Sequence, residues 1–155
     1  MATNIFNKGS NSVSRSGIIV DAFVDNDSTT IDIEQPANSI LTKAIAHVVE
    51  AGVSTGNADW GYKVGTTGDD DKFAIDADGF DASGTGPAAD TVVVCIPASG
   101  TVESKSFTAA TAGTAADGYS SVARKIRCTA TCGNVTSVDQ AGKVAFTLFF
   151  DVLPR

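Results

Sequence analysis

The stretch VAFTLFFDV, residues 144–152, alternates apolar residues with others along most of its length. In an extended chain successive side chains point to opposite sides, so every second residue shares a face. The residues of the apolar face are Val144, Phe146, Leu148, Phe150 and Val152. A period of two predicts a β-strand with one buried face. We therefore expect this strand to supply a stripe of the hydrophobic core.

A second alternating stretch, residues 125–132, precedes the first. Its apolar face consists of Ile126, Cys128, Ala130 and Cys132, and its polar face of Lys125, Arg127, Thr129 and Thr131. This pattern predicts a half-buried strand with a polar outer surface. The connecting residues, 133–143, include Asn134, Asp139 and Gly142, which permit tight turns. The two stretches together predict a C-terminal pair of strands.

Short runs rich in β-branched residues recur toward the N-terminus, at 18–24, 29–34, 62–64 and 91–96. Many short strands between turn signals are typical of sandwiches and barrels. We predict an all-β fold, a β-sandwich or jelly roll of about eight strands, built as a single domain over residues 17–155. Residues 1–16 are polar and have no period, so they are predicted to be an N-terminal arm. The connections at 69–71, 76–81 and 108–118 are predicted to be loops, the first two acidic.

Residues 40–49 fit two structures. The apolar residues at 40, 41, 44, 45, 48 and 49 have helical spacing, with Ser39 as an N-cap candidate and Gly52 near the C-terminal end. A strand is also consistent with the sequence. Its faces would be Ile40, Thr42, Ala44, Ala46 and Val48 on one side, and Leu41, Lys43, Ile45, His47 and Val49 on the other. Periodicity alone leaves both alternatives open.

Composition excludes several classes of protein. The chain has 155 residues, 43% of them hydrophobic, and a formal net charge of −7 at pH 7. An acidic surface repels phosphates, so nucleic acid is not an expected partner. The longest apolar runs, 92–96 and 146–150, are too short to span a bilayer, so no membrane association is expected. The polar N-terminus lacks an apolar secretion signal, which predicts synthesis in the cytoplasm.

No catalytic or metal-binding constellation is predicted. The single histidine, His47, has no Ser or Cys motif nearby and is interpreted as a polar residue on an element face. Zinc is not expected, because a zinc site needs a second Cys or His pair. Cys95, Cys128 and Cys132 are therefore predicted to be small buried residues. Six aspartates could form a loose calcium site, but we prefer to interpret them as solvated carboxylates in turns. They are Asp69, Asp70, Asp71, Asp76, Asp78 and Asp81. We expect no cofactor, no metal and no enzymatic activity.

The middle of the chain, residues 34–73, resembles a pattern common in tailed-bacteriophage virion proteins. In that pattern a strand ending in V-x-E-A precedes a loop and a V-G-T-x-G-D-x-D-x-F sequence. Here Val49-Glu50-Ala51 is followed by VGTTGDDD at 64–71 and by Phe73. The C-terminal part also resembles the ending of these proteins, through Thr129-Ala130-Thr131, Gly133, Thr136 and Gly142-Lys143-Val144.

The resemblance implies a virion structural protein, a β-sandwich that decorates or cements capsids or sits on head and tail fibres. It favours a strand for residues 40–49. We expect a capsid decoration (cement) protein that binds the outside of the shell and bridges capsid subunits. Its expected partners are the major capsid protein and copies of itself, with a trimer preferred from the resemblance and from capsid threefold positions. Its expected location is the capsid surface of the virion.

Four residues are interface candidates. Ile5 and Phe6 are an apolar pair in the polar arm, which suggests an attachment element that becomes ordered on binding. Lys125 and Arg127 lie in the net-positive part of an acidic chain, and we expect one of them to pair with a carboxylate across a subunit boundary. The alternative function is a fibre or receptor- or carbohydrate-binding module. Its site would be Trp60, Tyr62 and the acidic loops, although packing of both rings in the core or an interface is preferred.

Overall fold

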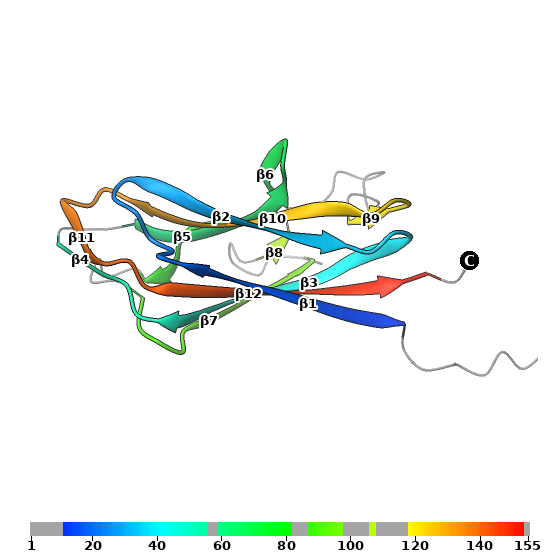
Figure 1. Cartoon of the computed structure of the whole chain (residues 1–155), viewed down its shortest axis with the longest axis horizontal. Helices are drawn as coiled ribbons and strands as arrows, with labels where there is room; N and C mark the ends of the chain where they lie inside the picture. Colours follow the sequence, from blue (N-terminus) through cyan, green and yellow to red (C-terminus); the bar gives the residue numbers. More distant parts are fainter. Residues whose placement is uncertain (1–10, 56–58, 82–86, 98–105, 108–117, 154–155) are drawn as a thin grey trace, which may run out of the picture.

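The structure is a computed structural model that describes residues 11–55, 59–81, 87–97, 106–107 and 118–153. For residues 74–81, 94–97 and 106–107 the description covers the backbone alone. The described residues form strands, turns and connections, in two layers of sheet that face each other (Figure 1). No described residue belongs to a helix long and apolar enough to cross a membrane.

The first sheet contains the alternating stretch at residues 144–152. Its order is β1 (Ser12–Val20), β12 (Lys143–Val152), β3 (Ser39–Glu50), β7 (Val92–Pro97) and β8 (Ser106–Phe107), and β9 (Tyr119–Ser120) pairs with the start of β3. Neighbours are antiparallel except β7 and β8, which are parallel. β1 therefore lies at one edge of this sheet (Figure 1).

The second sheet has the order β2 (Asp27–Gln35), β10 (Arg124–Gly133), β5 (Asp59–Thr66) and β6 (Asp69–Asp81), all antiparallel. β5 and β6 form a hairpin whose turn is Thr67 and Gly68. A small two-stranded sheet, β4 (Val53–Thr55) with β11 (Ser137–Gln140), lies at one end of the molecule (Figure 1).

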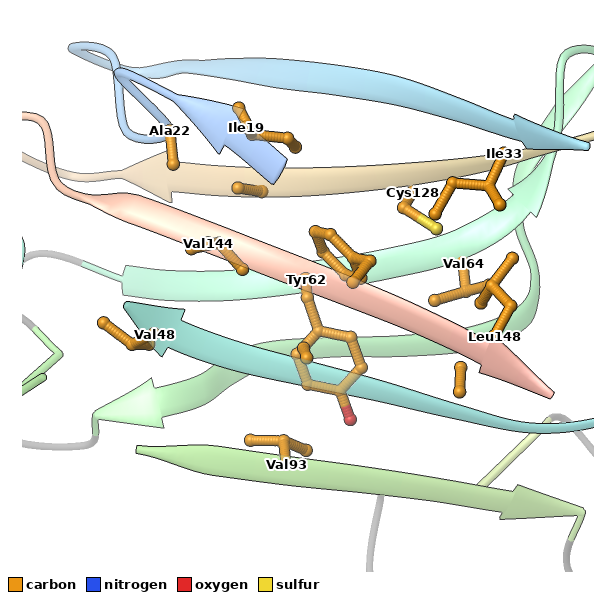
Figure 2. Packing of buried hydrophobic residues seen from close by; sticks show 14 of the residues in the cluster. Ile19, Ala22, Ile33, Val48, Tyr62, Val64, Val93, Cys128, Val144 and Leu148 are labelled. Atoms are coloured by element: carbon orange, nitrogen blue, oxygen red, sulfur yellow. The ribbon is translucent and has the colours of Figure 1, made fainter. Parts of the chain in front are cut away.

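The core lies between the two large sheets and is built from the alternating stretches. Val144, Phe146, Leu148 and Phe150 of β12 are buried, and so are Ile126, Cys128, Ala130 and Cys132 of β10. Figure 2 shows these layers meeting, with Tyr62 of β5 extending from one sheet toward the other. Phe23 and Trp60 pack edge to face, with ring centroids 4.7 Å apart and planes at 87°. The all-β sandwich predicted from the alternation is confirmed.

Residues 40–49 are strand, as the resemblance favoured, but the predicted faces are wrong at one end. Ala44, Ala46 and Val48 are buried as expected, whereas Leu41 is buried in place of Ile40 and Thr42. The register shifts here, because Lys43 pairs with Phe149 and Leu41 with Phe150. A bulge inserts one extra residue and so moves the preceding side chains to the opposite face.

Other expectations differ from the structure. The described residues contain twelve strands rather than about eight, since short strands such as β4 and β9 have no alternation long enough to detect. β1 begins at Ser12, inside the range assigned to the arm, 1–16, because Ser12 to Ser16 pair with β12. Residues 69–71 and 76–81 are not loops but parts of β6, which pairs with β5 despite its many Asp residues. The expected loop at 108–118 lies outside the described residues except for Gly118.

Candidate interaction surface

The outer surface of the second sheet carries charged residues on neighbouring strands. The register places Lys125 beside Glu34, Arg127 beside Asp32, and Thr129 between Thr30 and Lys63. We call the outward side chains of this sheet the charged face: Asp32, Glu34, Lys63, Asp70, Lys125 and Arg127. Antiparallel pairing brings these side chains within reach of each other, because directly opposite residues lie on the same face.

Arg127 and Asp32 form the central ion pair of the charged face. Arg127 Nε lies 3.0 Å from Asp32 Oδ1, and Nη2 lies 3.3 Å from Oδ2, so the guanidinium donates two hydrogen bonds to one carboxylate. The hydrogen bond from Arg127 lowers the pKa of Asp32, and the same contact raises the pKa of Arg127. The structure therefore places a carboxylate beside Arg127 within its own chain.

Lys125 is the exposed member of the predicted basic pair. No ion pair of Lys125 forms with the part of the chain that the structure describes. Its neighbour in register, Glu34, lies 3.6 Å from Arg15 on β1, with more than half of the Glu34 side chain exposed. The cross-subunit partner expected for Lys125 or Arg127 stays a prediction, for which Lys125 offers the more accessible charge.

The three aspartates that begin β6, next to the hairpin turn, interact with neighbouring charged groups. Lys63 Nζ lies 3.3 Å from Asp70 Oδ2, which neutralises one of the three consecutive carboxylates. The neighbouring Asp71 raises the pKa of Asp69, because a hydrogen bond between the two carboxyl groups requires a proton on one of them. Within the described residues, no group of three or more His, Cys, Asp or Glu could hold a metal ion. The side chains of Asp76, Asp78 and Asp81, part of the candidate calcium set, lie outside the described residues.

Asp32→Asn is expected to lower the free energy of unfolding by about 1 kcal/mol at pH 7, because it removes the charge from a pair that is less than one third exposed. The folded state lowers the pKa of Asp32, so the pair contributes fully above the unfolded pKa of about 4 and the contribution is lost as pH falls through the folded value. The difference between wild type and variant should therefore shrink below about pH 4 in urea unfolding curves.

Asp151→Asn is the control for this series. Asp151 is exposed and accepts a hydrogen bond from the Ser12 hydroxyl at 2.7 Å, which an amide oxygen also accepts. Its effect should be small at every pH. A difference for Asp32→Asn that stays constant from pH 7 to about pH 2 would show that the ion pair does not stabilise the fold.

A groove lies between the edges of the two sheets. It has a volume of about 350 Å³ and is lined by Arg15, Ser16 and Gly17 of β1 and by Ile31, Asp32, Ile33 and Glu34 of β2. Gly17 permits the close approach of the strands, because a Cβ there would lie 2.7 Å from Ile31 Cδ1. Sequence reasoning missed this groove, since it placed residues 12–16 in the arm. The alternation of Ser with other residues from 12 to 16 was the available signal.

His47 and two of the cysteines, the candidates for catalysis or metal binding, can be placed in the structure. His47 lies on the outer face of β3, 3.4 Å from the exposed carboxylate of Asp90, as expected for a polar residue on an element face. Cys128 and Cys132 are buried, and burial raises the pKa of Cys132 to about 11. A thiol with a raised pKa is a poor nucleophile at neutral pH. The side chain of Cys95 lies outside the described residues.

The alternative binding site at Trp60 and Tyr62 is contradicted by burial. Both side chains are fully buried between the sheets, so neither ring can stack on a sugar. The third predicted component, the acidic loops, is part of β6. The remaining interface candidates, Ile5 and Phe6, lie outside the described residues.

Comparison with known proteins identifies similar folds. No protein-family model and no curated protein matches the chain. A chain in the capsid asymmetric unit of cyanophage Pam1 is similar with a TM-score of 0.55 and 12% identity, over 99% of this chain and 93% of that chain. A chain in the capsid of Ralstonia phage GP4 is similar with a TM-score of 0.53 and 17% identity, over 100% of this chain and 93% of that chain. At these identities the likeness establishes a shared fold. Because nearly all of both chains is covered, the capsid chains are about as long as this one.

Proposed function

We propose that this chain is a bacteriophage capsid decoration protein that binds the outside of the shell and stabilises it by bridging capsid subunits. The observation that carries the proposal is the shared fold, over nearly the whole length of both chains, with chains in two phage capsids. Chains of this length lie within those capsids as complete units, which supports an accessory component. The resemblance in residues 34–73 and 129–144 supports the same class of protein.

The mechanism is mechanical. A protein that binds assembled capsid subunits but not separated ones stabilises the assembly, by about 2.7 kcal/mol per site at a concentration one hundred times its dissociation constant. Repetition of the same contact over a symmetric shell adds avidity without any new kind of contact. The sandwich suits this role, because the strands that carry the charged face are held by a buried core. The chain acts as a homo-oligomer in this proposal, without enzymatic activity.

The charged face is the proposed contact with the major capsid protein, and Lys125 is its accessible positive charge. Charge complementarity across an interface sets register and association rate more than affinity. The arm with Ile5 and Phe6 is a second proposed attachment. Burial of the two side chains would contribute roughly 1.5–3 kcal/mol each, less the cost of ordering the arm.

Added protein is expected to raise the temperature at which shells lacking it release their DNA, in a saturable way, as followed by dye fluorescence during heating. Lys125→Glu should weaken binding to the shells about tenfold at low salt and less at high salt, because ions screen the repulsion. Deletion of residues 2–10, which spares β1, should also weaken binding.

Lys43→Glu is the matched control, since Lys43 lies on the outer surface of the first sheet over the Phe149 ring. It makes the same charge change away from the charged face. Shells that take up no protein, or that lose DNA at an unchanged temperature when saturated with it, would overturn the proposed function. Equal effects of the two lysine variants would refute the charged face as the contact.

A further inference from the structure

β1 is an edge strand with a regular register, and no described strand pairs with its outer side. It pairs only with β12 among the described strands, in an unbroken register from Ser12 opposite Asp151 to Val20 opposite Lys143. The pairing of β12 with β3 contains two register shifts, whereas none interrupts that of β12 with β1. From Ser14 onward, such an edge strand presents a row of backbone groups that can form hydrogen bonds with another strand.

The direction of these backbone groups follows from one hydrogen bond. Val152 N–H donates to the Asn11 carbonyl at 3.0 Å, in line with the register of β1 and β12. Hydrogen-bonded and non-hydrogen-bonded pairs alternate along an antiparallel ladder, so the even-numbered residues of β1 direct their N–H and C=O groups away from β12. The hydroxyl groups of Ser16 and Thr147, 2.8 Å apart, fit the close side chains of a non-hydrogen-bonded pair.

The side chains of β1 do little to prevent pairing. The strand contains neither Pro nor Lys, and its only charge is Arg15. Ile18 and Val20 are 46% and 55% exposed, although both are β-branched and apolar. From Ser12 to Ser16 both faces of the strand are exposed, because the sandwich opens there into the groove beside β2. Natural edge strands are commonly protected by charged residues, Pro, bulges or shortness. Of these devices β1 has one, the charge of Arg15.

We propose that two copies of this chain pair antiparallel through β1, about a two-fold axis at Ser16, so that their first sheets form one continuous sheet. A hydrogen-bonded ladder between the copies requires even-numbered residues to face even-numbered residues. With the axis at Ser16, Ser14 lies opposite Ile18 of the partner subunit and Ser12 opposite Val20 of the partner subunit. Each exposed aliphatic side chain then packs beside a small hydroxyl residue rather than against another branched one.

The charge of Arg15 disfavours the neighbouring register toward the N-terminus. With the axis at Ser16, Arg15 lies opposite Gly17 of the partner subunit, and the missing side chain leaves room for the guanidinium group. Shifting the axis by one residue toward the N-terminus would place Arg15 opposite Arg15 of the partner subunit, and like charges directly opposite are destabilising. The interface is isologous, so it gives a dimer and not the trimer expected from the resemblance.

A cysteine at the axis tests the register. In a hydrogen-bonded pair the Cα atoms lie about 5.5 Å apart, within disulfide range. Ser16→Cys should therefore form a disulfide-linked dimer on mild oxidation, identified by mass spectrometry of the linked peptides. Ser14→Cys is the matched control on the same face. In the proposed register its two copies are offset by four residues, about 13 Å, which is too far for a disulfide.

Sedimentation velocity tests the dimer without a cross-link. The wild type should sediment as a dimer, more strongly associated at high salt, because two chains of charge −7 repel each other. Ile18→Lys should raise the dissociation constant at least about tenfold. Val92→Lys, which changes a similarly exposed residue on β7 of the same sheet, should leave it unchanged.

These measurements are made in solution and do not depend on the proposed function. A wild-type monomer or trimer at all salt concentrations overturns the proposal. So does equal cross-linking of Ser14→Cys and Ser16→Cys, or equal weakening by the two lysine variants. Binding of a foreign strand to the β1 edge without self-association would also overturn it, because the proposed occupant is a second copy.

Discussion

Trp60→Ala is expected to lower the free energy of unfolding by about 3–5 kcal/mol, the range for truncating a buried aromatic residue. Trp60 is fully buried, packs edge to face on Phe23, and fills the space beside Gly52, where a Cβ would lie 2.7 Å from the ring. Removal of the indole leaves a cavity. The surrounding strands can fill it only partly, because hydrogen bonds within the two sheets hold their backbones in place. Equilibrium unfolding in urea, monitored by far-UV circular dichroism, measures the loss.

Val122→Ala is the control for this variant. Val122 is 65% exposed in the connection before β10, so its truncation should change the free energy of unfolding by less than about 0.5 kcal/mol. Trp60→Phe should lose less than Trp60→Ala, because most of the apolar volume remains. A loss below about 1 kcal/mol for Trp60→Ala would mean that the ring is accessible, and it would restore the idea of a binding platform.

Gln35→Met is expected to cost about 1–3 kcal/mol, although it keeps the volume of the side chain. Gln35 is fully buried at the end of β2 and joins three segments. Its Nε2 donates to the carbonyl groups of Ser39, at 3.0 Å, and Gly118, at 2.8 Å, while its Oε1 accepts from Arg124 Nε at 2.7 Å. The thioether of methionine has no hydrogen-bond donor, so the carbonyl groups of Ser39 and Gly118 would each lose a hydrogen bond in the protein interior.

Gln140→Met is the matched control. Gln140 is exposed on β11, and its amide donates only a long 3.4 Å hydrogen bond to Glu50. The same substitution there should change the free energy of unfolding by less than about 0.5 kcal/mol. Similar losses at both positions would mean that the hydrogen bonds of Gln35 contribute nothing beyond the general effect of replacing glutamine by methionine.

The strands whose buried face was predictable from sequence were those with a long, unbroken period. β12 and β10 each bury four residues at every second position, and burial of one face is a local property of the pattern. Residues 40–49 lacked such a signal, because the bulge at Thr42 breaks the period and moves Leu41 to the core. A bulge depends on the partner strand, which sequence alone does not identify.

The candidate surface was predictable only in part. The alternation of β10 placed Lys125 and Arg127 on the outer face, but the partner of Arg127, Asp32, lies 95 residues away on β2. Pairings over such distances depend on strand order. The same limit applies to the first part of β1, Ser12 to Ser16, whose polar composition resembles an arm and whose strand structure comes from pairing with β12 at the other end of the chain. Trp60 and Tyr62 were ambiguous, because an aromatic residue in a strand suits both a core and a binding face.

Cryo-electron microscopy of virions from a bacteriophage whose genome encodes this chain tests the central claim most directly. The proposed function predicts two-layered β-sandwich density on the outside of the shell, in contact with two or more capsid subunits at each site and absent from virions that lack the chain. Density for this sandwich at the tail alone, or virions that contain no copy of it, would contradict the proposal.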